Sequence, residues 1–204
     1  MSRKLCDECQ YPISACVCSA ISPVTSNTQV IVLQHPSEVG HAKNSVRLMQ
    51  LVLPDMQVVV GEKAEDFTAL KQQLEQSNNS VYLVYPSEKS QSVTQVSPAK
   101  DSTIVLIDGT WKKAYKMLQL NPWLLDYPAI HLDMNHQSNY IIRKAKRADS
   151  LSTLEATAHV LGGIDASLDT TPLFAALDAM VQHRLQAMPE QVRQRYQLST
   201  KDDS

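Results

Sequence analysis

One short run of residues limits the fold of this chain more than any other feature. The run Thr103–Ile107 is apolar and rich in β-branched residues, which is typical of a buried strand, and it stops abruptly at Asp108, Gly109 and Thr110. Trp111 then opens a basic helical segment that Thr110 can cap, while Gly109 allows a sharp turn or the close approach of a ligand. Open α/β sheets place ligands at the carboxyl ends of their strands, so Asp108 is a candidate site residue. An ordinary strand-turn-helix junction is the alternative.

Strand and helix patterns alternate along most of the chain, which predicts an α/β fold with a mainly parallel sheet and flanking helices. Strands are expected at residues 29–33, 57–60, 81–84, 103–107 and, more weakly, 129–132. Helices are expected at 37–53, 66–76, 111–120, 152–161 and 172–188, and residues 86–101 are expected to form a loop. A polar linker at 22–28 divides a small segment at 1–22 from a larger domain at 29–198.

Composition excludes several classes of protein. With 43% apolar and 20% charged residues, the 204-residue chain has the composition of a soluble globular protein. Its net charge of -2 gives no global attraction to nucleic acid, so RNA binding would need local basic patches. Its apolar runs are too short to span a bilayer, and its first residues lack the apolar core of a signal peptide. We therefore expect a cytoplasmic protein that does not enter the membrane.

The four cysteines form a local group spaced C-x2-C-x6-C-x-C. They are Cys6, Cys9, Cys16 and Cys18. Disulfides are unfavourable in a reducing cytoplasm, and four thiolates complete the closed tetrahedral shell of a structural zinc ion. An iron–sulfur cluster is one alternative. Redox or unliganded thiols are another, although the acids at positions 7 and 8 oppose thiolate formation. The segment 1–22 is thus predicted to be a zinc knuckle.

The common nucleotide-binding motifs are absent from the sequence. The chain has only five glycines, from which neither G-x-G-x-x-G nor a Walker loop can be assembled. It also lacks the G-x-S-x-G and H-E-x-x-H motifs. These absences argue against a Rossmann dehydrogenase, a Rossmann-type methyltransferase and a P-loop ATPase. A cofactor would have to be held by loops of another design.

The motif from Asp108 to Trp111 resembles the D-x-T-W signature of the DTW-domain family, whose members also carry an N-terminal cysteine cluster. These proteins are tRNA-uridine aminocarboxypropyltransferases that are distantly similar to SPOUT methyltransferases. The resemblance implies S-adenosylmethionine as cofactor, tRNA as partner and, as in short bacterial members, a variable-loop uridine as target. It also implies a SPOUT-like fold with a C-terminal trefoil knot, which generic rules of chain topology would argue against.

Three further segments are similar to the family pattern: His35–Glu38 with Asn44, Tyr85–Glu88, and Leu151–Ala156. The cofactor-binding residues that the resemblance implies are Pro86, Ser87, Glu88, Ile107, Gly109, Leu151, Ser152, Thr153 and Glu155. A purely structural explanation is also adequate. Pro36 can enter a helix that Ser37 caps, Pro-Ser-Glu is a common cap sequence, and Ser152 with Glu155 forms a capping box.

Local basic patches are the candidate RNA-binding surface. Four cations fall within residues 143–147, and three lysines lie on or near the expected helix 111–120. The expected RNA contacts are His35, Asn44, Lys112, Lys113, Arg143, Lys144, Lys146 and Arg147. A merely solvated charge run is the alternative.

The expected catalytic residues are Asp108, Thr110 and Trp111. Uridine N3 becomes a nucleophile only after it loses its proton, and a carboxylate in a partly desolvated pocket is a suitable base. Asp108 is the expected base, or else it holds the substrate ammonium or fixes the loop. Thr110 would orient a substrate, and Trp111 would stack on adenine or on the target base, unless it belongs to the core.

Three other functions remain open from the sequence. A SPOUT-type RNA methyltransferase would transfer methyl from the same cofactor. An rRNA aminocarboxypropyltransferase would act on another RNA, and a zinc-containing RNA-binding adaptor would perform no catalysis. A monomer is favoured for the oligomeric state.

Overall fold

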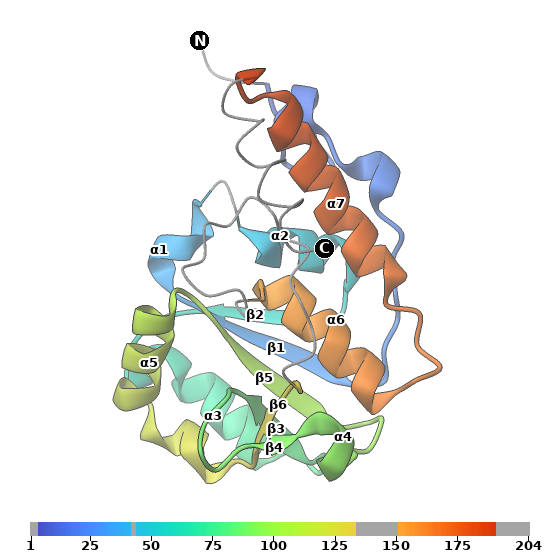
Figure 1. The fold of residues 1–204 in the computed structure, drawn as a ribbon. Coiled ribbons are helices and arrows are strands. Elements are labelled where there is room, and N and C mark those ends of the chain that lie inside the picture. Colours follow the sequence, from blue (N-terminus) through green and yellow to red (C-terminus); the bar gives the residue numbers. More distant parts are fainter. Residues whose placement is uncertain (1–3, 42–43, 134–150, 191–204) are drawn as a thin grey trace.

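Six parallel strands form one sheet at the centre of the molecule (Figure 1). The computed structural model describes residues 4–41, 44–133 and 151–190. The strand order is β2-β1-β5-β3-β6-β4, and every pair of neighbours is parallel. The strands are β1 (Gln29–Gln34), β2 (Gln57–Val60), β3 (Val81–Val84), β4 (Gln91–Ser92), β5 (Thr103–Asp108) and β6 (Ala129–His131). The predicted α/β class with a parallel sheet is confirmed.

Helices cover both faces of this sheet (Figure 1). One layer contains α2 (Ser45–Val52), α4 (Val93–Val96), α6 (Thr153–Ile164) and α7 (Thr171–Gln186). The other contains α3 (Thr68–Glu75), α5 (Trp111–Leu120) and the 3-10 helix η4 (Pro122–Asp126). Along β1, Val30 and Val32 pack in the first layer, and Ile31 and Leu33 pack in the second. Burial of both faces explains why the central strands are continuous apolar runs.

The helix expected at residues 37–53 is wrong in its extent, because two helices occupy this segment. The short α1 (Pro36–Val39) ends at Gly40, and α2 begins after Asn44. The Asn44 side chain accepts a hydrogen bond from the backbone N–H of Val46 at 2.9 Å and so starts a new helix. The apolar period alone did not reveal this capping site.

The expected loop at residues 86–101 is also only partly correct. It contains the two-residue edge strand β4 and the short helix α4, which Ser92 caps. Both elements are too short to produce a recognisable period in the sequence. The remaining 3-10 helices are η1 (Ile13–Ala15), η2 (Cys18–Ala20) and η3 (Ala64–Phe67).

The neighbouring strands β1 and β5 form a topological switch point. The chain leaves β1 toward α2 on one face of the sheet and leaves β5 toward α5 on the opposite face. In open α/β sheets a crevice for ligands lies outside the carboxyl ends of two such strands. The residues at this place are Gln34 and His35 after β1, and Asp108 and Gly109 after β5.

The cysteine segment packs against the main body of the protein. Cys9, Tyr11 and Val17 belong to the same buried cluster as α2, α6 and α7, and η1 and η2 contact α7. Whether residues 1–22 and 29–198 form separate domains stays a prediction. The chain between β6 and α6 includes residues 134–150, outside the described residues, so the trefoil knot also stays a prediction. Among the described helices, none is both long and apolar enough to cross a membrane.

Candidate functional site

Asp108 joins three elements at the switch point. Its Oδ2 accepts a hydrogen bond from Gln34 Nε2 at 2.9 Å, and its Oδ1 accepts one from Thr153 Oγ1 at 2.6 Å. Gln34 is its direct partner across the β1–β5 register, and Thr153 is the first residue of α6. The carboxylate is therefore fixed by donors from a strand and from a helix N-terminus that lies 45 residues further along the chain.

Gln34 is a site residue that the sequence analysis missed. Gln34 is 4% exposed, and its Nε2 also donates to Asn44 Oδ1 at 3.2 Å. Asn44, expected to contact RNA, is itself buried, and its Nδ2 donates to the carbonyl of Val39 at 3.1 Å. The available signal was a polar residue that ends an apolar strand at the ligand-binding edge of the sheet.

Gly109 and Thr110 make the turn from β5 into α5. Thr110 caps α5 as predicted, because its Oγ1 accepts from the backbone N–H of Lys113 at 3.4 Å. The expected turn is present, but it does not depend on a left-handed conformation, because none of the five glycines has a positive φ. The constraint at Gly109 is space: a Cβ there would lie 3.2 Å from Lys113 Cβ and 3.7 Å from His35 Cβ.

Trp111 lies at the surface beside the site and not in the core. The residue is 49% exposed, and its ring meets that of Tyr85 edge-on, with centroids 6.2 Å apart. Burial is the main cause that raises the pKa of Tyr85, and Tyr115 adds to it. Tyr115 follows Trp111 by one helical turn and is 59% exposed. Two aromatic rings of α5 thus face solvent next to the carboxyl ends of β3 and β5.

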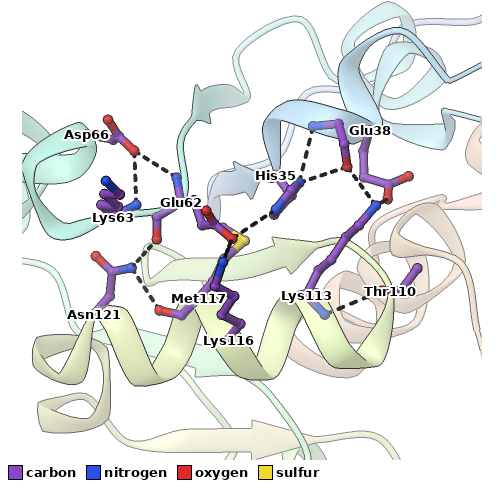
Figure 2. A network of polar contacts seen from close by, with 11 residues as sticks. His35, Glu38, Glu62, Lys63, Asp66, Thr110, Lys113, Lys116, Met117 and Asn121 are labelled. Atoms are coloured by element: carbon purple, nitrogen blue, oxygen red, sulfur yellow. Dashed lines mark hydrogen bonds and ion pairs between the residues drawn. The ribbon is translucent and has the colours of Figure 1, made fainter.

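His35 fixes the loop after β1 (Figure 2). Its Nδ1 accepts the backbone N–H of Ser37 at 3.2 Å, so His35 caps α1 and the expected cap at Ser37 is wrong. Pro36 occupies the first turn, as expected. Because Nδ1 is an acceptor, the ring proton is assigned to Nε2, which lies 3.2 Å from Glu62 Oε1.

Two lysines of α5 hold the loops that follow β1 and β2 (Figure 2). Lys116 Nζ lies 2.8 Å from Glu62 Oε1, and this contact, followed by that with His35, lowers the pKa of Glu62. Lys113 Nζ lies 2.8 Å from Glu38 Oε1 and donates to Ser37 Oγ at 2.6 Å. Lys113, an expected RNA contact, therefore already has an acidic partner.

Lys112 differs from these two lysines. It is exposed and makes no ion pair with any residue in the described ranges. The other basic residues expected to contact RNA, Arg143, Lys144, Lys146 and Arg147, lie outside the described residues. Of the lysines of α5, all within the described residues, Lys112 is thus the best candidate for a contact with phosphate.

The backbone of Glu62 is held as firmly as its side chain (Figure 2). Asp66 Oδ2 accepts the N–H groups of Glu62 and Lys63 at 2.8 and 2.9 Å, which lowers the pKa of Asp66. Asn121, fully buried, donates to the Glu62 carbonyl at 2.9 Å. The loop after β2 is therefore held by hydrogen bonds to its backbone as well as by contacts of the Glu62 side chain.

The expected cofactor-binding residues lie in three segments: the turn after β3, the end of β5 and the start of α6. Ser152 and Glu155 form the predicted capping box, with hydrogen bonds of 2.8 and 3.2 Å, and Glu155 is 1% exposed. The turn Pro86–Glu88 is exposed and starts no helix, so the cap interpretation of this Pro-Ser-Glu is wrong. Instead, the Ser87 N–H donates to Ser90 Oγ at 2.8 Å. Ile107 and Leu151 are half-buried.

A second polar group at this edge was also missed by the sequence analysis. Asp133, just after β6, accepts from Ser92 Oγ at 2.8 Å and from Thr94 Oγ1 at 3.2 Å. Ser90 Oγ lies 2.9 Å from His131 Nδ1. These side chains come together only because β4 pairs with β6, a pairing that the sequence did not indicate.

The four cysteine sulfurs are arranged as a metal ion would require. All four lie within 4.8 Å of one another, with Cys6 at 3.6 Å from Cys16 and from Cys18, and Cys9 at 3.8 Å from Cys16. Zinc–sulfur bonds of about 2.3 Å in a tetrahedron place sulfurs about 3.8 Å apart, so the cluster fits a tetrahedral metal site.

The electrostatics of the cluster agree with this fit. Backbone N–H groups of Cys9 and Glu8 donate to the Cys6 sulfur and lower the pKa of Cys6 to about 7. Hydrogen bonds with Cys16 and Cys6 raise the pKa of Cys18 to about 12. Thiols this close together do not all ionise unless a cation offsets their charge.

Comparisons with known proteins identify one family. The DTW domain family model matches residues 3–185. The tRNA-uridine aminocarboxypropyltransferase 2 of Drosophila melanogaster is 32% identical over 171 residues, covering 80% of this chain and 68% of the fly protein. Its namesake from Macaca fascicularis is 26% identical over 196 residues, covering 90% of this chain and 66% of its own length.

A plant protein is also similar. The tRNA-uridine aminocarboxypropyltransferase A of Arabidopsis thaliana is 22% identical over 198 residues, which cover 80% of this chain and 73% of the plant protein. The chain spans about two thirds of the length of the animal relatives that it matches. No solved structure matches the chain significantly. The extent of the family match and the identity to the fly protein show that the chain belongs to the DTW-domain family.

Proposed function

We propose that this protein transfers the 3-amino-3-carboxypropyl group of S-adenosylmethionine to N3 of a tRNA uridine. The proposed target is a uridine in the variable loop. The products are 3-(3-amino-3-carboxypropyl)uridine and 5'-methylthioadenosine. The observation that carries the proposal is the position of Asp108, at the switch point of a parallel sheet and held by two donors. The names of the curated relatives supply the activity class.

Asp108 is the proposed general base. Hydrogen bonds from Gln34 and Thr153 each use one lone pair of a carboxylate oxygen, and each oxygen retains another. A free lone pair can take the N3 proton of uridine as N3 attacks carbon. Bound S-adenosylmethionine supplies the electrophilic γ-carbon, whose bond to sulfur breaks with both electrons moving to the sulfur.

The cofactor would lie between three segments at the carboxyl edge: the turn Pro86–Glu88, the end of β5 at Ile107 and Gly109, and the start of α6 from Leu151 to Glu155. Ser152 and Glu155 satisfy each other in the capping box, so they support the pocket by shaping its loop. The N-terminus of the 12-residue α6 favours a carboxylate of the ligand.

The exposed side of α5 is the proposed contact surface for RNA. Trp111 and Tyr115 offer ring faces on which unpaired bases can stack, and Lys112 offers a charge for phosphate. Thr110 caps the helix and thereby orients Trp111. His35 and Asn44 act by fixing the loop around the site, since their polar atoms bond to Glu62, Gln34 and the backbone.

We further propose that the four cysteines hold structural zinc and that the protein is a cytoplasmic monomer. The support for zinc is the sulfur spacing, which leaves no ligand position for a substrate. A reducing compartment keeps such thiols available for metal.

The proposed reaction is tested by following two labels. Purified protein is incubated with unmodified tRNA and with S-adenosylmethionine labelled in either the carboxyl carbon or the methyl group, and nucleosides are identified by mass spectrometry. We expect the carboxyl label in tRNA and the methyl label in 5'-methylthioadenosine. Methyl label in RNA would show a methyltransferase instead, and a product on rRNA alone would show the ribosomal enzyme. Absence of cofactor binding in calorimetry would favour the adaptor.

Mapping the modified fragment in tRNA from a deletion strain tests the variable-loop assignment. Loss of 3-(3-amino-3-carboxypropyl)uridine from that loop is the expected result. Loss from the D-loop would contradict the assignment without contradicting the chemistry.

A further inference from the structure

The buried hydrogen bonds beside Asp108 have a fixed direction. The backbone N–H of Val46 donates to Asn44 Oδ1, and Asn44 Nδ2 donates to the carbonyl of Val39. These two backbone partners determine which end of the Asn44 carboxamide is oxygen. Asn44 therefore presents an acceptor toward Gln34.

The orientation of Gln34 follows from that of Asn44. Asn44 Oδ1 can only accept hydrogen bonds, so the Gln34 atom that faces it at 3.2 Å is the amide nitrogen. The second hydrogen of the same NH2 group points at Asp108 Oδ2, at 2.9 Å. A carboxylate is an acceptor, so the whole series is consistent only when Gln34 donates and Asp108 accepts.

Burial makes this arrangement costly to change. Gln34 is 4% exposed and Asn44 is 8% exposed, so water does not readily replace a lost partner. Turning the Gln34 amide around would place its oxygen against two acceptors. The amide is thus held in one orientation by the cap of α2 on one side and by Asp108 on the other.

We propose that Gln34 is a positioning residue for the transfer reaction: it holds the Asp108 carboxylate as an oriented acceptor, and Asn44 fixes the direction of the Gln34 amide. This inference rests on the proposed function, because it assumes that Asp108 is the base. The cap of α2 thereby acts on the site, even though Asn44 does not touch the reacting atoms.

The same two strands provide a matched control. At the other end of the β1–β5 pair, Gln29 lies opposite Thr103, and Gln29 Oε1 accepts from Thr103 Oγ1 at 3.2 Å. Gln29 uses its oxygen and Gln34 uses its nitrogen. Replacement of either glutamine by glutamate keeps a side-chain acceptor but removes the donor. We therefore expect kcat to change in Gln34→Glu and not in Gln29→Glu.

The first test is Gln34→Met, which keeps the length of the side chain and removes both hydrogen bonds. We expect kcat to fall by about 100-fold, the size of effect that a misplaced catalytic group produces, with unchanged KM for S-adenosylmethionine and for tRNA. Gln29→Met should retain wild-type kcat. Thermal unfolding of both variants checks that a loss at position 34 is not a loss of fold. A Gln34→Met enzyme with wild-type kcat would overturn the proposal.

The second test, Gln34→Glu, separates positioning from packing. Ionised, the new carboxyl faces two acceptors and is expected to lower kcat strongly. Protonated, it donates to Asp108 again, so activity relative to wild type should recover as pH falls, by about tenfold per unit. Gln34→Met and Gln29→Glu should show a constant ratio to wild type across pH. A Gln34→Glu ratio that does not change with pH would contradict the positioning role.

The two proposals fail in different ways. A wild-type protein that forms no aminocarboxypropyl product would refute the proposed function. An active wild type that is inactivated by Asp108→Ala but tolerates Gln34→Met would refute only the positioning role of Gln34.

Discussion

At the scale of the residue, the charge of Asp108 is what the proposed chemistry requires. Asp108→Asn keeps the shape of the side chain, but an amide cannot take the N3 proton and turns an NH2 toward one of the two donors. We expect product formation on tRNA to fall by about 10²- to 10⁴-fold, the usual contribution of a general base, while S-adenosylmethionine still binds.

Nucleoside mass spectrometry measures the product, and calorimetry measures cofactor binding. Asp101→Asn is the control, since Asp101 is exposed at the opposite end of β5, before its first residue. Full activity of Asp108→Asn would remove the base role and leave Asp108 as a structural link between β1, β5 and α6.

Gly109 provides a stability prediction at the same scale. In Gly109→Ala the new methyl would lie 3.2 Å from Lys113 Cβ, which is tighter than ordinary contact, so α5 must shift. We expect destabilisation of about 1–3 kcal/mol by denaturant unfolding, the usual range for overpacking.

Gly40→Ala is the matched control for this experiment. A Cβ at Gly40 meets nothing within 4 Å, and the backbone there has a negative φ. The substitution should be neutral or slightly stabilising. Equal effects of the two alanines would show that crowding at Gly109 is unimportant.

At the scale of the element, α5 carries two neighbouring lysines with different expected roles: Lys112 binds tRNA, and Lys113 stabilises the fold. Lys112→Ala should weaken tRNA binding and reduce the slope of log K against log salt by about 1, as expected for one phosphate contact. Lys113→Ala should leave that slope unchanged and lower the melting temperature, because it breaks the contact with Glu38. Titrations at several salt concentrations measure the slope. The reverse pattern would place the RNA on the other side of the helix.

The cysteine segment gives a second prediction at this scale. If zinc holds the four sulfurs, chelation should lower the melting temperature and release one zinc ion per chain, detected by a metallochromic dye. Cys9→Ser should behave like the chelated protein, because Cys9 is buried against the body of the molecule. A melting temperature that is insensitive to both treatments would contradict a structural metal.

The elements that could be predicted from sequence are those whose signal is local. Strand β5, the Thr110 cap and the Ser152–Glu155 box all depend on residues a few positions apart, and all three were confirmed. The break between α1 and α2 was missed because Asn44 lies inside a segment whose apolar period continues without interruption into a helix.

Contacts between distant segments were not predictable in the same way. Gln34 is a site residue only because the register of β1 places it opposite Asp108, 74 positions away in the chain. Asp133 meets Ser92 only because β4 adds to the edge of the sheet beyond β6. The sequence indicates which residues are polar at strand ends, but strand order decides which of them meet.

At the scale of the whole molecule, strand order also explains why the site is where it is. β1 and β5 lie side by side, and their helices depart to opposite faces, so the segments that follow the two strands diverge at the edge where open α/β sheets bind ligands. Two lysines of α5 form ion pairs with acids that follow strands of the sheet: Lys113 with Glu38 after β1, and Lys116 with Glu62 after β2. The helix that presents aromatic rings to solvent therefore also anchors the loops that follow β1 and β2.

Long-range ion pairs predict how the whole fold responds to acid. Asp165, at the end of α6, contacts Lys100 before β5 at 2.7 Å, and hydrogen bonds from Lys100 and Ser167 lower the pKa of Asp165 to about 2. A carboxyl whose pKa is lower in the folded state stabilises the fold above its unfolded pKa. That contribution is lost as pH falls from the ordinary value of 3.8 toward about 2. Asp165→Asn should therefore melt below wild type at neutral pH, and the difference should vanish near pH 2.

Lys100→Met tests whether the pair itself causes this difference. The hydrogen bond with Lys100 is the largest single cause of the lowered pKa of Asp165, so Lys100→Met should reproduce a large part of the effect of Asp165→Asn, and the double variant should add little to Asp165→Asn. Melting temperatures of the wild type, the two single variants and the double variant, measured from neutral pH to pH 2, complete this double-mutant cycle. Additive effects, or a gap that persists in acid, would mean that Asp165 stabilises the end of α6 locally through Ser167, whose backbone N–H donates to Asp165 Oδ1 at 2.9 Å. In that case the carboxyl would act as a helix-end cap and not as a link between α6 and the central strand.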